Sequence, residues 1–156
     1  MNLEWRDRNG NRQGSLRDVL LYNQIRISPD GLRIAISRLD SKGALDIWLY
    51  QINRDAWTRF TFGDGTDTDP VWSPDSKMIA YSSDIKGVVD IYLRPSSGAG
   101  AEEVILETSV SKIPTDWSRD GKFIAYHSQP GNFSNRDIWI LPMSSSGKKS
   151  DRKSVV

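Results

Sequence analysis

Histidine and cysteine, which recur in catalytic and metal sites, are almost absent from this chain. His127 is the only histidine and there is no cysteine, so a His-ligated or thiolate metal site lacks partners. Ser-Pro-Asp occurs at Ser28 and again at Ser73, but no Gly-x-Ser-x-Gly motif presents a serine as a nucleophile. We therefore predict that this chain carries no catalytic constellation and is not itself an enzyme.

The acidic segment 64–69 is the candidate for binding a cation. Asp64, Asp67 and Asp69 supply carboxylate oxygens, which are the ligands that Ca²⁺ prefers. Their spacing departs from the Asp-x-Asp-x-Asp-Gly pattern of calcium loops. We expect a solvated loop without metal or cofactor, and keep a calcium-stabilised site as the alternative.

Three further aspartates precede isoleucine in similar segments. They are Asp46, Asp90 and Asp137, each followed by Ile and then Trp or Tyr. Because one such aspartate occurs in every repeat, we expect local hydrogen bonding rather than catalysis.

The strongest pattern is a hairpin turn that occurs three times. Its aspartates, Asp30, Asp75 and Asp120, are spaced at a constant interval of 45 residues. Pro before the Asp presets φ, the Asp side chain bonds back to the backbone, and Gly after it tolerates positive φ. Ser76 replaces Gly in the second copy and Arg119 replaces Pro in the third, and neither change should abolish the turn.

Short β-prone segments flank each turn, which predicts an all-β fold of about three four-stranded antiparallel units. In the segment after the second turn, Ile79 and Tyr81 alternate with Met78, Ala80 and Ser82. Both sides are apolar or small, as expected when both faces of a sheet are covered. A period of about 45 residues with four strands per unit is typical of propeller blades.

The repeat also predicts the domain organisation. We expect the trailing strands of one blade at 1–21, full blades at 22–63 and 64–108, an incomplete blade at 109–143, and a flexible, partly artefactual tail at 144–156.

The motif from Trp72 to Asp75, with Ile-Ala-Tyr and Asp-Ile-Tyr after it, resembles the TolB-like β-propeller repeat. The resemblance covers residues 22–143 and implies a closed ring of about six blades, of which this chain would supply about three. It also implies a bacterial protein and a periplasmic or other extracytoplasmic location. The opening segment 3–10 resembles propellers fused to bacterial kinase or DNA-binding regulator domains.

The resemblance implies a non-catalytic module that binds protein or peptide, such as part of a sensor or signalling receptor. The alternative is the substrate-gating propeller of a prolyl-oligopeptidase-like serine peptidase with its catalytic domain outside this chain. Variable loops on a rigid scaffold are common recognition sites, so we predict binding at the loop face formed by 40–44, 63–69, 84–88, 109–112 and 129–136. The candidate binding residues are Asp64, Asp67, Asp69, Asp84, Lys86, Phe133 and Arg136.

Charge and hydropathy restrict the partners. The net charge is +1, which gives no electrostatic footprint for nucleic acid. The sequence has no apolar run of the length that a transmembrane helix needs. Three blades would leave open faces and sheet edges, so we expect the chain to self-associate through them.

Overall fold

The computed structural model describes residues 3–16, 22–39, 43–129 and 136–143. Every regular element within them is a β-strand, and the strands form antiparallel sheets. Among these residues there is no helix with the length and apolarity to span a bilayer.

The first two large sheets have four strands each, in sequential order. The first contains β3 (Tyr22–Ile27), β4 (Arg33–Leu39), β5 (Leu45–Gln51) and β6 (Ala56–Arg59). The second contains β7 (Asp67–Trp72), β8 (Met78–Ser83), β9 (Asp90–Pro95) and β10 (Glu103–Leu106).

The third sheet has three strands within the described residues, and a separate hairpin precedes the first sheet. The third sheet contains β11 (Ser111–Trp117), β12 (Phe123–Gln129) and β13 (Asp137–Pro142). The hairpin pairs β1 (Leu3–Arg6) with β2 (Arg12–Leu16). The all-β prediction and its antiparallel repeat are thus confirmed.

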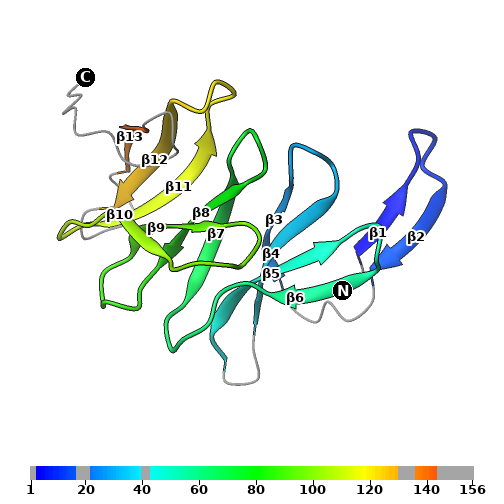
Figure 1. Cartoon of the computed structure of the whole chain (residues 1–156), viewed down its shortest axis with the longest axis horizontal. Coiled ribbons are helices and arrows are strands. Elements are labelled where there is room, and N and C mark those ends of the chain that lie inside the picture. The colour runs from blue at the N-terminus through cyan, green and yellow to red at the C-terminus, as the bar shows by residue number, and fades with distance from the viewer. Residues whose placement is uncertain (1–2, 17–21, 40–42, 130–135, 144–156) are drawn as a thin grey trace.

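The predicted turns form with the predicted chemistry. In the second copy, Ser73 Oγ donates to Asp75 Oδ1 at 2.7 Å and accepts the Met78 N–H at 2.9 Å, while Lys77 N–H donates to Asp75 Oδ1. The first and third copies make the same bonds. The three turns point to the same end of the molecule, at the top of Figure 1.

The third turn position requires a left-handed backbone in every copy. Gly31 and Gly121 have φ of 71° and 75°, and Ser76 has 61° despite its Cβ. Bonds from neighbouring segments hold Ser76, because its carbonyl oxygen accepts from Arg33 Nη2 and from Ser96 Oγ. Packing between sheets therefore sustains a backbone conformation that serine alone disfavours.

The sheets stack face to face, and the core lies between them. Ile79 and Tyr81 pack with residues of the first sheet such as Ile47, whereas Ala80 packs with residues of the third such as Trp117. The predicted alternation of faces in β8 is therefore correct. Fully burying one large apolar side chain stabilises the fold by roughly 1.5–3 kcal/mol.

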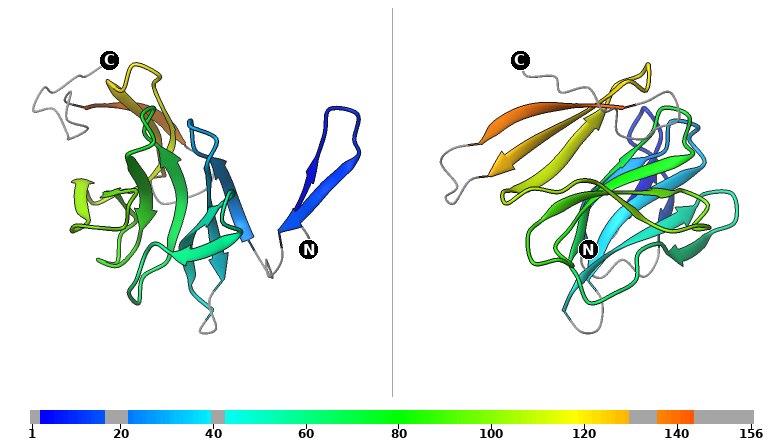
Figure 2. Two further views of the ribbon diagram at one scale, coloured as in Figure 1. Left: turned by 45° about the vertical axis from the view of Figure 1, so that its right-hand side comes forward. Right: turned by 60° about the vertical axis from the view of Figure 1, so that its left-hand side comes forward.

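The first strand of each large sheet lies on the inner side of the stack. β3 lies next to β7, and β7 lies next to β11, so the sheets fan out from a shared inner edge (Figures 1 and 2). Side chains of the β1–β2 hairpin, including Leu16 and Trp5, cover part of the outer face of the first sheet.

Two predicted loop boundaries are wrong. We expected a loop at 63–69, but β7 already begins at Asp67, where it pairs with Ser83 of β8. A bulge between Thr68 and Val71, with Asp69 at φ 55°, lets the strand continue through the acidic segment. The loop predicted at 109–112 likewise ends early, because β11 begins at Ser111.

Candidate functional site

A pocket of about 410 Å³ opens where the inner strands β3, β7 and β11 end in their tight turns. All of its lining residues come from three sets of equivalent positions, 45 residues apart in the three repeats. These sets are 26, 71 and 116, then 27, 72 and 117, and then 29, 74 and 119. The lining residues are Arg26, Ile27, Pro29, Val71, Trp72, Pro74, Asp116, Trp117 and Arg119. Because each inner strand contributes the same positions, the pocket lies at the shared inner edge, and we call it the axial pocket.

The axial pocket has a buried apolar floor. Val71, Trp72 and Trp117 are at most 6% exposed. The Trp72 Nε1–H donates to the Arg26 carbonyl oxygen at 3.1 Å, and the Trp117 Nε1–H donates to the Gly121 carbonyl oxygen at 3.1 Å. Both indoles are thus held in place by the backbone.

The rim of the axial pocket is exposed and charged. Arg26, Asp116 and Arg119 are exposed residues. Asp116 Oδ1 accepts the N–H of Trp117 at 2.9 Å, which keeps this carboxylate near the backbone. Within the part of the chain that the structure describes, the Arg26 guanidinium makes only a 3.4 Å contact with the adjacent Ile25 carbonyl.

The predicted binding residues at the opposite, loop end have different surroundings. The Asp84 carboxylate accepts the Thr66 N–H at 2.6 Å, and Lys86 Nζ lies 2.8 Å from Glu107 Oε2. Asp64 and Arg136 are exposed. Phe133 lies outside the described residues.

The loops 63–66 and 84–87 do lie against each other. A Cβ at Gly65 would lie 3.0 Å from the backbone of Ile85. The structure therefore brings Asp84 close to the acidic segment through Thr66. Asp69 and Arg136 both lie near enough to His127 for their charges to act on its imidazole. The binding role of these residues stays a prediction.

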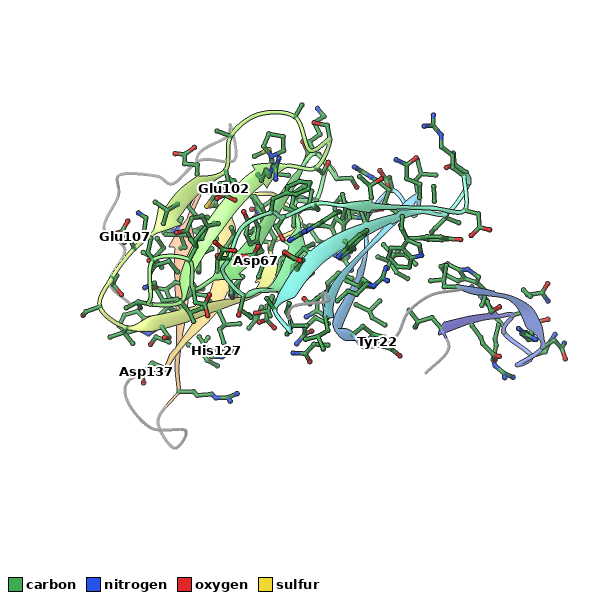
Figure 3. All side chains as sticks on the ribbon, turned by 90° about the horizontal axis from the view of Figure 1, so that it is seen from below. Tyr22, Asp67, Glu102, Glu107, His127 and Asp137 are labelled. Carbon is green, nitrogen blue, oxygen red and sulfur yellow. The ribbon has the colours of Figure 1, made fainter. Side chains whose placement is uncertain are left out.

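Asp67 is buried rather than offered to solvent. It is 6% exposed and lies among the sheets, as Figure 3 shows. Burial raises the pKa of its carboxyl group, and Asp46 and Glu102 raise it further, while the Ser83 and Thr61 hydroxyls oppose the shift. Glu102 is itself bound by the Tyr81 hydroxyl.

The described part of the chain contains no side-chain cluster of the kind that holds metal ions in proteins. No group of three or more His, Cys, Asp or Glu residues there is arranged to hold a metal ion. His127 is half-buried, and burial followed by the Arg136 charge lowers the pKa of its imidazole.

Sequence reasoning missed the axial pocket. Its signal was present, because the interval of 45 residues that relates the turn aspartates also relates Arg26, Val71 and Asp116. Applying the interval to the ends of the inner strands would have placed these side chains around one axis.

Four-stranded antiparallel sheets that fan out from a shared inner edge and stack face to face define a β-propeller. The family model described as the TolB β-propeller domain matches residues 23–151. The chain belongs to this family.

Individual relatives agree with that assignment. The chain is 32% identical over 104 residues to the uncharacterized peptidase YuxL of Bacillus subtilis strain 168. This match covers 62% of the chain and 16% of that protein. Among solved structures, TolB from Acinetobacter baumannii superposes with a TM-score of 0.75 at 20% identity, over 95% of this chain and 36% of that one.

A solved prolyl endopeptidase gives a TM-score of 0.67 at 20% identity. The match covers 97% of this chain and 25% of the endopeptidase chain. Likeness at these identities concerns the fold. The chain thus spans only a minor part of the length of each of these three proteins.

Proposed function

We propose that this chain is a protein- or peptide-binding propeller module, and that the axial pocket is its binding site. One observation carries the proposal: equivalent positions of the three repeats converge on the pocket, and at one of these positions the side chains differ in charge. Arg26 is cationic, Val71 is apolar and Asp116 is anionic. A packing role favours similar residues in each repeat, whereas recognition favours different ones.

The chemistry of the axial pocket suits a peptide. Its floor offers two indoles and a valine, and tryptophan and arginine are the residue types that most often dominate binding energy at interfaces. The loop face, with exposed Asp64, Lys86 and Arg136, is proposed as a second, weaker contact surface.

Photo-crosslinking in the full-length protein in its native host tests this proposal. A photoreactive amino acid is placed at Pro29 on the axial rim, at Lys86 on the loop face, or at Arg54 in the β5–β6 turn. We expect a discrete partner adduct from position 29, a weaker one from position 86 and none from position 54. Equal adduct patterns at all three positions, or none at position 29, would contradict the proposal.

A second candidate function is the substrate-gating propeller of a serine peptidase. The match to the peptidase YuxL and the likeness to a prolyl endopeptidase favour it. In such a protein the axial pocket would contact a peptide on its way to a catalytic domain elsewhere in the chain.

The full reading frame separates the two candidates. A Gly-x-Ser-x-Gly motif downstream, together with hydrolysis of a proline-containing peptide that is lost when its serine is changed, would establish the peptidase. A kinase domain upstream and no measurable hydrolysis would favour a sensor module.

A further inference from the structure

Two arginines on the axial rim lack a carboxylate partner. Within the described residues, neither Arg26 nor Arg119 forms an ion pair, and Arg26 makes only the weak contact with its neighbour's carbonyl. Both are exposed and line the same pocket. Unpaired guanidinium groups beside an apolar floor are arranged as in sites that bind carboxylates.

The nearby acidic residues do not neutralise these arginines. The turn aspartates Asp30, Asp75 and Asp120 each accept bonds from their own turn and lie within 4 Å of a Lys or Arg three or fewer positions away. Asp116 accepts a bond from the backbone that follows it and keeps its own charge. The lining of the pocket therefore carries two positive charges, those of Arg26 and Arg119, against the one negative charge of Asp116.

The apolar floor sets the second requirement. Val71 and Trp72 are buried beneath this rim, and Ile27 is 58% exposed beside it. A ligand that reaches the arginines can therefore place an apolar group against Ile27 at the edge of this floor, which a free inorganic anion cannot do. Burial of that apolar group would favour a peptide over a small ion.

From these contacts we propose that the axial pocket binds a peptide carboxylate between Arg26 and Arg119, with an adjacent apolar side chain on the floor. The inference rests on the proposed function and adds the chemistry of the partner. The carboxylate is either an Asp or Glu side chain or the carboxyl end of a peptide, since both offer the same pair of oxygens.

Defined hexapeptide pools test the inference. Immobilised full-length protein is incubated with random amidated pools in which one position is fixed as Glu or as the isosteric Gln, and with the same pools as free acids. Retained peptides are counted by mass spectrometry. We expect about tenfold enrichment, either of Glu over Gln at one position or of free acids over amides. The first result would identify an acidic side chain as the source of the carboxylate, and the second would identify the carboxyl end of the peptide.

Charge variants supply the controls. Arg26→Gln and Arg119→Gln should each reduce the enrichment several-fold, and added salt should reduce it in the wild type. The Arg54→Gln substitution, which changes an exposed arginine in the β5–β6 turn, should leave the enrichment unchanged.

Equal retention of acidic and neutral peptides would overturn the carboxylate site but leave peptide binding intact. Retention of no pool would overturn the proposed function as well.

Discussion

At the scale of single residues, the repeated turn depends on a backbone conformation that most side chains disfavour. Gly31 has φ of 71° and no atom within 4 Å of the place a Cβ would occupy. Any penalty for adding a methyl group there therefore comes from the backbone and not from a clash.

Gly31→Ala should lower the free energy of unfolding by about 1–2 kcal/mol. Urea denaturation of the full-length protein measures the change. Gly14→Ala is the matched control, because Gly14 lies in β2 without positive φ and its added Cβ would meet Trp5 at an ordinary 3.6 Å. Equal effects of the two substitutions would contradict this account of the turn.

Because the Asp67 carboxyl group is buried, we expect the stability of the fold to depend on pH. The pKa of its carboxyl group is raised in the folded state by burial and by nearby carboxylates. A raised folded pKa favours the protonated form, so the contribution of Asp67 to stability is greatest at low pH and is lost as pH rises through the folded pKa.

Asp67→Asn should therefore raise Tm at neutral pH by a few degrees, and the gain should vanish under acidic conditions. Differential scanning calorimetry across this pH range checks the prediction. A variant that melts below the wild type at neutral pH would show that the ionised carboxylate stabilises the fold.

At the scale of elements, the once-per-repeat aspartates hold the sheets in different ways. Asp46 lies 2.8 Å from Arg59 of β6 in its own sheet. Asp90 instead lies 2.6 Å from Lys112 of β11 in the next sheet, and both side chains are 2% exposed. The local hydrogen-bond prediction is right for Asp46 and incomplete for Asp90.

Lys112→Met should lower the free energy of unfolding by about 3–5 kcal/mol, because it leaves Asp90 buried without a countercharge. Lys86→Met is the control, since Lys86 and Glu107 form an exposed pair whose loss should cost about 1 kcal/mol or less. Chemical denaturation of both variants gives the comparison. Similar losses would mean that the buried pair does not connect the sheets.

The strands and turns were predictable because their signals are local. Pro-Asp-Gly in the first turn determines its geometry within a few residues. The start of β7 at Asp67 was not predictable, because it depends on pairing with Ser83 across the sheet. The Lys112 partner of Asp90 was missed for the same reason, since stacking of sheets decides it.

At the scale of the whole molecule, the outer face of the third sheet resembles the faces that the other sheets bury. Ile138 and Ile140 are 83% and 51% exposed, whereas Ile91 and Leu93, at the corresponding positions of β9, are 0% and 2% exposed. The exposed face has the residue types of a surface that another propeller sheet covers.

Residues 1–156 alone should therefore associate in a concentration-dependent way, and Ile138→Glu with Ile140→Glu should reduce that association. Sedimentation velocity measures it. A cooperative monomer at high concentration, unaffected by the substitutions, would mean that this face needs no cover.

A peptide bound in the axial pocket should protect the backbone that surrounds it. Hydrogen–deuterium exchange of the full-length protein, with and without the most strongly retained peptide from the pools, measures this protection. We expect slower exchange at 26–29, 71–74 and 116–119. Unchanged exchange there, with slower exchange at 63–66 and 84–88 instead, would contradict this expectation and place recognition at the loop face.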